Sequence, residues 1–182
     1  MKGDKECAIV LNLPEGSYTA LVGSKSDAET AKAVVAAFDF ETGATISKLK
    51  GISTNATVTP SALMVAGVTI TGGTKKVVFQ VQATGTYPSS DGYLQDPVLY
   101  ITGTTGVLAV VDNWKNGPDA GYDDTVYNTS YLAELENSNY AMKGDKECAI
   151  VLNLPEGSYT ALVGSKSDAE TAKAVVAAFD FE

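Results

Sequence analysis

Residues 142–182 read MKGDKECAIVLNLPEGSYTALVGSKSDAETAKAVVAAFDFE, and residues 1–41 read the same without a single difference. We call residues 1–41 the first copy and residues 142–182 the second copy. Residues 42–141 lie between them, occur once, and are called the body. The chain therefore holds one period of 141 residues and 41 residues of another. We interpret it as a window of a natural tandem array, and an engineered duplication is the alternative.

The composition favours a packed domain and excludes several classes of function. The chain has 182 residues, of which 45% are hydrophobic, and a net charge of −9 from 13 basic and 22 acidic side chains. A nucleic-acid partner needs clustered Lys and Arg, so none is expected. The absence of histidine removes His-based catalysis and the usual zinc sites, and we expect no enzyme activity. The lack of a long apolar run predicts no membrane insertion.

Short β-branched runs separated by Gly, Ser, Thr and Pro predict strands throughout the period. Seven or more such strands in one period predict an all-β fold, an antiparallel β-sandwich that is Ig-like or jelly-roll-like. A strand segment from its C-terminal end is duplicated at the N-terminus of the chain. Residues 1–41 are then a partial repeat, and residues 42–182 form a complete sandwich repeat. The predicted strands are 62–71, 74–84, 97–102, 107–111, 146–154, 158–163 and 173–181, with a short helix possible within 125–135.

Alternation within the second copy predicts which side chains face the core. Cys148 falls on the same side of its strand as Ile150 and Leu152, and we expect it to be a small buried residue. Glu147 falls on the opposite, outward side. In the last strand, Ala174 and its alternate neighbours are assigned outward although they are small and apolar. That strand is therefore either central within one domain or packed against another domain.

The order of motifs in the period resembles a tandem β-sandwich repeat of large secreted and cell-surface bacterial proteins. The matching residues include an Asp-Asn-Trp loop at 112–114, a Leu-Pro-x-Gly-x-Tyr-Thr-Ala hairpin at 154–161 and an apolar strand at 175–180 that ends in Asp. Ile52-Ser53-Thr54, Lys75-Lys76-Val77-Val78 and Asp96-Pro97 match earlier parts of that pattern. The resemblance implies an extracellular or cell-surface array of sandwich domains without catalysis. This chain departs from it because the repeats of that family usually differ from one another.

The duplication leaves one body and two identical segments that can complete it. If the second copy fills the sandwich, the apolar face of the first copy needs another partner, since three strands alone make a poor core. We therefore expect self-association: a structural subunit of an extracellular fibre, joined head to tail by strand complementation. The alternative is that residues 1–41 are a passive fragment of a neighbouring bead. The predicted interface residues are Cys7, Ile9, Leu11, Leu13, Tyr18, Val35, Phe38 and Phe40.

Acidic residues in the loop 112–124 offer a candidate calcium site, because Ca²⁺ prefers carboxylate and carbonyl oxygens from flexible loops. No other cofactor is expected, and a plain solvated acidic loop is the competing interpretation. The candidate ligands are Asp112, Asn113, Asp119, Asp123 and Asp124.

Trp114 and several tyrosines share the stretch 114–140, and exposed rings there could stack on sugars. This makes a carbohydrate-binding module of a repetitive surface adhesin the runner-up function. The alternative is that these rings cover one end of the sandwich.

Overall fold

The computed structural model describes residues 7–24, 33–38, 50–167 and 169–181. The chain divides into two units, Met1–Leu49 and Lys50–Glu182. The second unit begins nine residues after the end of the first copy. The predicted boundary between residues 41 and 42 marks the end of the duplication, whereas the compact unit starts at Lys50.

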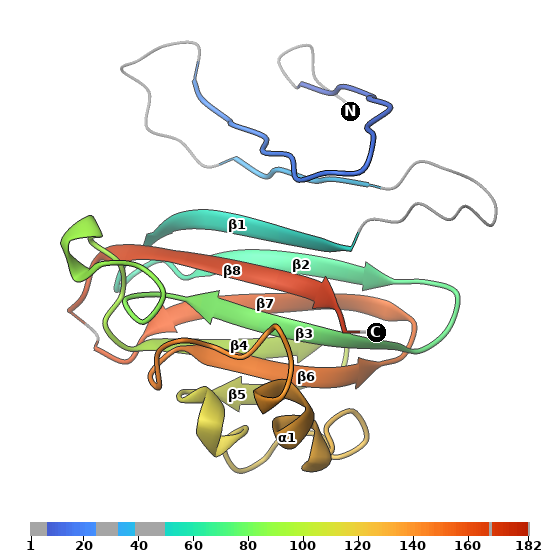
Figure 1. Cartoon of the computed structure of the whole chain (residues 1–182), viewed down its shortest axis with the longest axis vertical. Coiled ribbons are helices and arrows are strands. Elements are labelled where there is room, and N and C mark those ends of the chain that lie inside the picture. Colours follow the sequence, from blue (N-terminus) through green and yellow to red (C-terminus); the bar gives the residue numbers. More distant parts are fainter. Residues whose placement is uncertain (1–6, 25–32, 39–49, 168, 182) are drawn as a thin grey trace. The chain divides into compact units, whose positions relative to one another are not determined.

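The second unit contains two four-stranded antiparallel sheets packed face to face, which confirms the all-β sandwich (Figure 1). The body supplies five strands and the second copy supplies three. From the body come β1 (Gly51–Val58), β2 (Met64–Ile70), β3 (Lys75–Gln82), β4 (Pro97–Gly103) and β5 (Gly106–Val111); from the second copy come β6 (Cys148–Leu154), β7 (Gly157–Ser165) and β8 (Ala172–Asp180).

The strand order identifies the sandwich as a jelly roll. One sheet has the order β1-β8-β3-β6 and the other β2-β7-β4-β5. The pairs β1·β8, β2·β7, β3·β6 and β4·β5 are all antiparallel, so the chain folds as a long two-stranded ribbon that wraps around a core. Of the two predicted sandwich types, the jelly roll is therefore the one observed.

Apolar side chains from both sheets meet between the layers. Phe79 of β3, Leu99 of β4 and Leu152 of β6 are each no more than 1% exposed there. Alternation along each strand places these residues inward, as the sequence patterns of β3 and β6 predict. The strand predictions match the observed elements to within about two residues at most ends. β1 was not predicted, because GISTNATV is largely polar.

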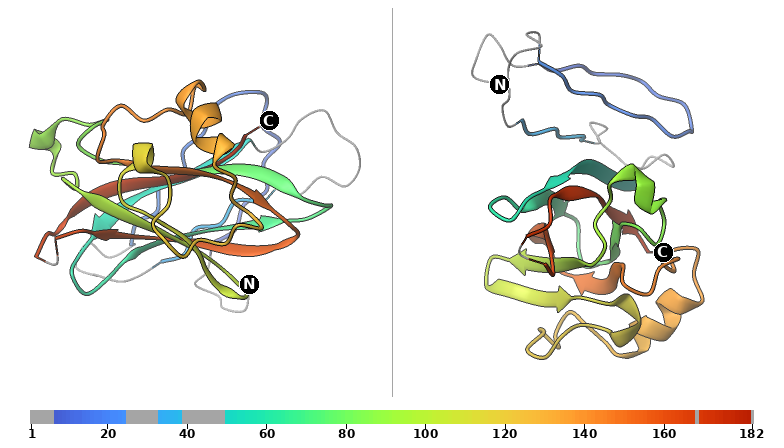
Figure 2. Two further views of the ribbon diagram at one scale, coloured as in Figure 1. Left: turned by 90° about the horizontal axis from the view of Figure 1, so that it is seen from below. Right: turned by 90° about the vertical axis from the view of Figure 1, so that its left-hand side faces the viewer.

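A second, smaller cluster covers the outer face of the first sheet. Trp114 and Leu135 pack there on Val78 and Val151, next to the short helix α1 (Ser130–Glu136). Among the described residues, 3-10 turns occur at η1 (Ser89–Asp91) and η2 (Trp114–Asn116), in connections between strands (Figure 2). No helix among the described residues is long and apolar enough to cross a membrane.

The helix starts later than the predicted segment 125–135. Asp123 explains the delay, because its carboxylate accepts hydrogen bonds from the backbone N–H (2.9 Å) and the hydroxyl (2.5 Å) of Thr125. This turn competes with helical geometry at that point. Asn128 then accepts a bond from the backbone N–H of Ser130, where α1 begins.

The described residues of the first unit, 7–24 and 33–38, contain no helix or strand, and all are exposed. They include large apolar side chains such as Ile9, Leu21 and Phe38, which are 78%, 92% and 82% exposed.

Candidate assembly interface

The second copy supplies three of the four strands on one side of the jelly-roll ribbon, and β5 of the body supplies the fourth. β8 lies between β1 and β3, and β7 lies between β2 and β4. β6 forms the edge beyond β3. If β6, β7 and β8 are removed from this order, β1, β2 and β3 have no partner in either sheet. Only the β4·β5 hairpin keeps its pairing, so the body cannot form this sandwich alone.

The second copy buries its apolar side chains in this position. Cys148, Leu152 and Leu154 of β6 are fully buried, and Ile150 is 2% exposed, as their shared alternation predicts. β6 also buries its other face, where Ala149 and Val151 lie under Trp114 and Met142.

The assignment of faces in β8 was wrong. Ala174, Val176 and Ala178, which were assigned outward, contact the main core between the sheets. Phe179 packs on the opposite side of the sheet, with its ring centroid 5.3 Å from that of Tyr140. Because β8 is central and covered on both sides, period-two alternation carries little information about which face is inside.

The same apolar side chains are exposed in the first copy. Ile9 is 78% exposed where its counterpart Ile150 is 2% exposed, and Val35 is 53% exposed where Val176 is 1% exposed. Cys7 is exposed and Cys148 is buried. Among the other predicted interface residues, Leu11, Leu13, Tyr18 and Phe38 are 59%, 46%, 54% and 82% exposed, and Phe40 lies outside the described residues.

The tight turn of the duplicated segment is the same in both copies. Tyr159 donates a hydrogen bond from its hydroxyl to the backbone oxygen of Pro155, over 2.8 Å. Tyr18 donates the equivalent bond to Pro14, over 2.7 Å. The turn is therefore encoded locally, whereas the strands on either side of it need partners from the body.

Cys148 anchors the start of β6 in the core. Its Sγ lies 3.1 Å from the backbone oxygens of both Pro97 and Asp112. Burial raises the pKa of this thiol well above its usual value, and the nearby carboxylate of Asp112 raises it further. The thiol is neutral at physiological pH and is shielded from reagents, in agreement with the predicted structural role.

Glu147 was placed on the outward face, and this prediction was wrong. Its carboxylate is 1% exposed and accepts backbone N–H bonds from Ala83 (2.7 Å), Thr86 (2.9 Å) and Gly144 (2.9 Å). Glu147 precedes the first residue of β6, so strand alternation does not apply to it. Gly85 and Gly144 allow this close approach, since a Cβ on Gly85 would lie 2.4 Å from the Cα of Gly144.

The five candidate calcium ligands do not converge in the structure. Asp112 pairs with Lys166 and also accepts a bond from Asn113. Asp123 is engaged with Thr125, which lowers the pKa of its carboxyl group. Asp119 and Asp124 are exposed. Within the described ranges, no group of three acidic or cysteine side chains is placed to hold a metal ion.

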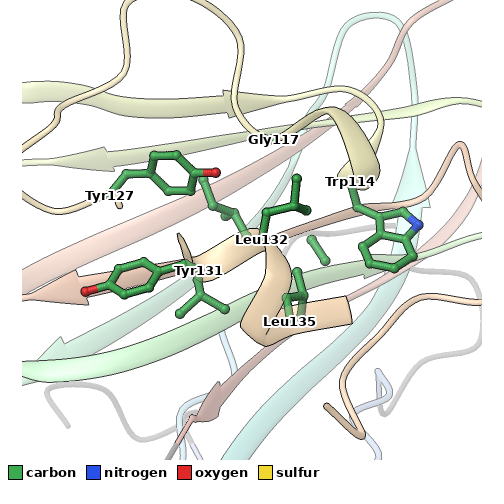
Figure 3. A pocket seen from close by; sticks show the side chains of 9 residues that line it. Trp114, Gly117, Tyr127, Tyr131, Leu132 and Leu135 are labelled. Atoms are coloured by element: carbon green, nitrogen blue, oxygen red, sulfur yellow. The ribbon is translucent and has the colours of Figure 1, made fainter. Parts of the chain in front are cut away.

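Trp114 and Tyr127, two of the aromatic residues proposed to stack on sugars, are buried, whereas Tyr122 is 36% exposed. Trp114 is 4% exposed and donates its ring N–H to the backbone oxygen of Gly144, over 3.1 Å. Tyr127 is buried, and Tyr131 stands at right angles to it with ring centroids 6.3 Å apart (Figure 3). The hollow between these rings and α1 encloses about 10 Å³, which is room for one water molecule and none for a sugar. Trp114 covers the outer face of the first sheet and Tyr127 belongs to the main core, whereas the alternative expectation placed these rings over one end of the sandwich.

Comparison with protein-family models and with curated proteins gives no match to this chain.

Proposed function

We propose that this chain is a structural unit of a repetitive extracellular polymer, in which one 41-residue copy completes the sandwich of an adjacent unit. One observation carries the proposal: among the strands that the structure describes, β1, β2 and β3 of the body pair only with strands of the second copy. A body of this kind depends on strands that lie outside it, and the chain contains two copies of the sequence that forms those strands, of which its single body uses one.

The first copy has the chemistry that such a position requires. Its sequence equals that of β6–β8, so each apolar side chain that the core accepts from the second copy is also present in the first. At Ile9 and Val35 these side chains are exposed rather than buried. Burial of apolar surface stabilises by about 25 cal/mol per Å², so a three-strand face is strongly driven toward a matching body. The partner is therefore another copy of this body, either in a preceding repeat of an array or in a second chain.

The connection between copy and body sets how closely such units follow one another. Only ten residues, 40–49, separate the counterpart of Asp180 at position 39 from Lys50, where the next sandwich begins. Ten residues span at most about 36 Å when extended. Adjacent sandwiches would therefore form a close-packed string. The net charge of −9 adds mutual repulsion that keeps such a polymer dispersed, and the resemblance to secreted repeats supports an extracellular or cell-surface location.

Complementation between two full-length chains tests the proposal. In the acceptor, Ile9, Val35, Ile150 and Val176 are all changed to Asp, which disables both of its copies but leaves its body intact. In the donor, Trp114→Phe removes the only tryptophan of the chain and leaves a free first copy. Tryptophan fluorescence then reports on the body of the acceptor alone.

We expect the acceptor to be unfolded alone, because aspartates in the core are buried without partners. When it refolds with the donor, its Trp114 should become buried, and light scattering should show a one-to-one complex. A donor that also carries Ile9→Asp and Val35→Asp should give no rescue. Ser17→Asp in the donor is the matched control, since its counterpart Ser158 is exposed in the sandwich. If the acceptor stays unfolded with the intact donor at high concentration, the first copy is a passive fragment.

A further inference from the structure

We infer that the first copy can also replace the second copy in the sandwich of its own chain, giving a circularly permuted form of the same jelly roll. In this form β1–β5 keep their places, and residues of the first copy take the positions of β6, β7 and β8. The inference goes beyond the proposed function because it requires no second unit. It means that one chain has two ways to complete one body.

The neighbouring positions of β1 and β8 make this possible. The backbone N–H of Asp180, at the end of β8, donates to the backbone oxygen of Lys50, just before β1, over 2.9 Å. The counterpart of Asp180 in the first copy is Asp39, eleven residues before Lys50. The ten residues between them need only connect two positions that are hydrogen-bonded neighbours in the sandwich. Loop-closure entropy grows slowly with length, so a connection of this length is readily tolerated.

The register of every strand pair is preserved in the permuted form. Phe79 would face Ile9 instead of Ile150, and Leu99 would face Val22 instead of Val163. The pairing of β1 makes a specific demand on the incoming strand. A Cβ on Gly51 would lie 2.1 Å from the ring of Phe179, so this position is shaped around a phenylalanine.

The first copy supplies that phenylalanine at the right place. Phe38 is the counterpart of Phe179, and this residue is 82% exposed. The turn that joins the first two strands is already present as well, because Tyr18 and Pro14 make the same bond as Tyr159 and Pro155. The inserted form additionally needs the first copy to pair with the strands of the body. The second copy has the identical sequence and makes this pairing.

The buried position of the second copy indicates at which stage one copy can replace the other in the sandwich. β7 and β8 lie inside their sheets, so neither can leave without breaking pairs on both sides. Replacement therefore occurs while the chain folds, or after it unfolds. The two forms differ in one connection: residues 112–147 join β5 to β6 in one form, and residues 40–49 join the last strand to β1 in the other. Because the connection 40–49 is the shorter one, loop length favours the form with the first copy inserted, by about tenfold or less.

The experiment uses the two cysteines of the full-length chain as reporters, because Cys7 is exposed and Cys148 is buried. One variant carries Ile150→Asp and Val176→Asp, and its matched control carries Ile9→Asp and Val35→Asp. Each is unfolded, refolded at low concentration and treated with a maleimide. Tryptic peptides of the two copies are otherwise identical, and the substitutions distinguish them by mass.

We expect both variants to be folded monomers that label at opposite cysteines. The first should label at Cys148 and protect Cys7, and the control should label at Cys7 and protect Cys148. The variant with all four substitutions should be unfolded and label at both. If the first variant is also unfolded and labels at both cysteines, the inference is overturned. If it folds only as a concentration-dependent oligomer, exchange within one chain is overturned while the proposed function is supported.

A milder substitution tests the same inference in case the aspartate variants do not fold. Leu152→Ala leaves a cavity in the core rather than a charge, which disfavours the second copy by more than about thirtyfold. This exceeds the preference that loop length can impose, so Cys148 should be the labelled residue of the Leu152→Ala chain. Leu11→Ala should leave Cys7 labelled. Persistent protection of Cys148 in the Leu152→Ala chain would contradict the inference.

Discussion

The hydroxyl of Tyr159 donates to the backbone oxygen of Pro155, four residues earlier, over 2.8 Å. The same bond joins Tyr18 to Pro14, although the strands around Tyr159 are paired and the residues around Tyr18 form no strand. Two identical sequences thus agree in their local turn and differ in everything that depends on distant partners. This separates what the 41 residues encode by themselves from what the body must add.

Truncation of a core residue in the body should be strongly destabilising. Phe79 is 1% exposed, lies in β3 and has no duplicate in the chain, so neither copy can replace it. Phe79→Ala should lower the free energy of unfolding by about 3–5 kcal/mol. Urea denaturation followed by Trp114 fluorescence measures this value. Thr57→Ala, at an exposed site on β1, should change stability by about 0.5 kcal/mol or less. A loss below about 1 kcal/mol for Phe79→Ala would contradict the described core.

A methyl group at Gly85 should disturb the site of Glu147. The added Cβ would lie 2.4 Å from the Cα of Gly144, so the backbone must shift to accommodate it. Gly85→Ala should destabilise by about 1–3 kcal/mol. The control is Gly67→Ala in β2, where the nearest atom, the backbone oxygen of Tyr159, is at an ordinary 3.5 Å. The two variants are compared by thermal unfolding, and equal midpoints would show that this close approach is absent in solution.

One thiol per chain should react under native conditions. Cys7 is exposed, and Cys148 is buried with a raised pKa. A chromogenic disulfide reagent at pH 8 should therefore titrate one thiol rapidly and the second only in denaturant. The count does not depend on which copy completes the sandwich. Rapid reaction of both thiols would mean that neither copy is inserted.

Stability should fall at alkaline pH, in part because of the buried thiol. Burial raises the pKa of Cys148 in the folded chain, so the folded state holds this proton more tightly than the unfolded state. The stabilisation is complete below the unfolded thiol pKa of about 8.5 and is lost as pH rises toward the folded value. Urea denaturation at pH 8 and pH 10 measures the decline. Changing both Cys7 and Cys148 to Ala should make the decline shallower, and an unchanged slope would remove the thiol as its cause.

Alternating and β-branched patterns were sufficient to predict most strands and the sandwich class. They were informative in β3 and β6, where one face has a continuous row such as Cys148, Ile150 and Leu152. They failed for β1, whose polar sequence is held by pairing with β8, and for the faces of β8, which is covered on both sides. The deciding contacts come from residues that are distant in the sequence: Ala56 of β1 pairs with Ala174, and Tyr140 covers Phe179 on the outer face of β8.

The candidate interface is a prediction from the repeat, because identical sequences are compatible with the same partners. The buried carboxylate of Glu147 could not, since its partners Ala83 and Thr86 come from a distant loop. The two glycines Gly85 and Gly144, which lie close together beside Glu147, were the only hint of this site in the sequence. They can be recognised as a pair only in the folded structure. Composition also suggested an acidic site at residues 112–124, but Asp112 and Asp123 are engaged by Lys166 and Thr125.

The central claim is that the first copy forms the strands of a sandwich when it meets a body that lacks a functional copy of its own. Hydrogen exchange of the first copy tests this claim most directly. The donor chain carries Ser17→Ala, which marks its first-copy peptides by mass at a position whose counterpart is exposed. It is compared alone and after refolding with the acceptor whose two copies are disabled. We predict that the rapidly exchanging population of marked peptides is slowed by at least about a thousandfold in the complex. Unchanged rapid exchange of these peptides in the presence of a vacant body would contradict the account.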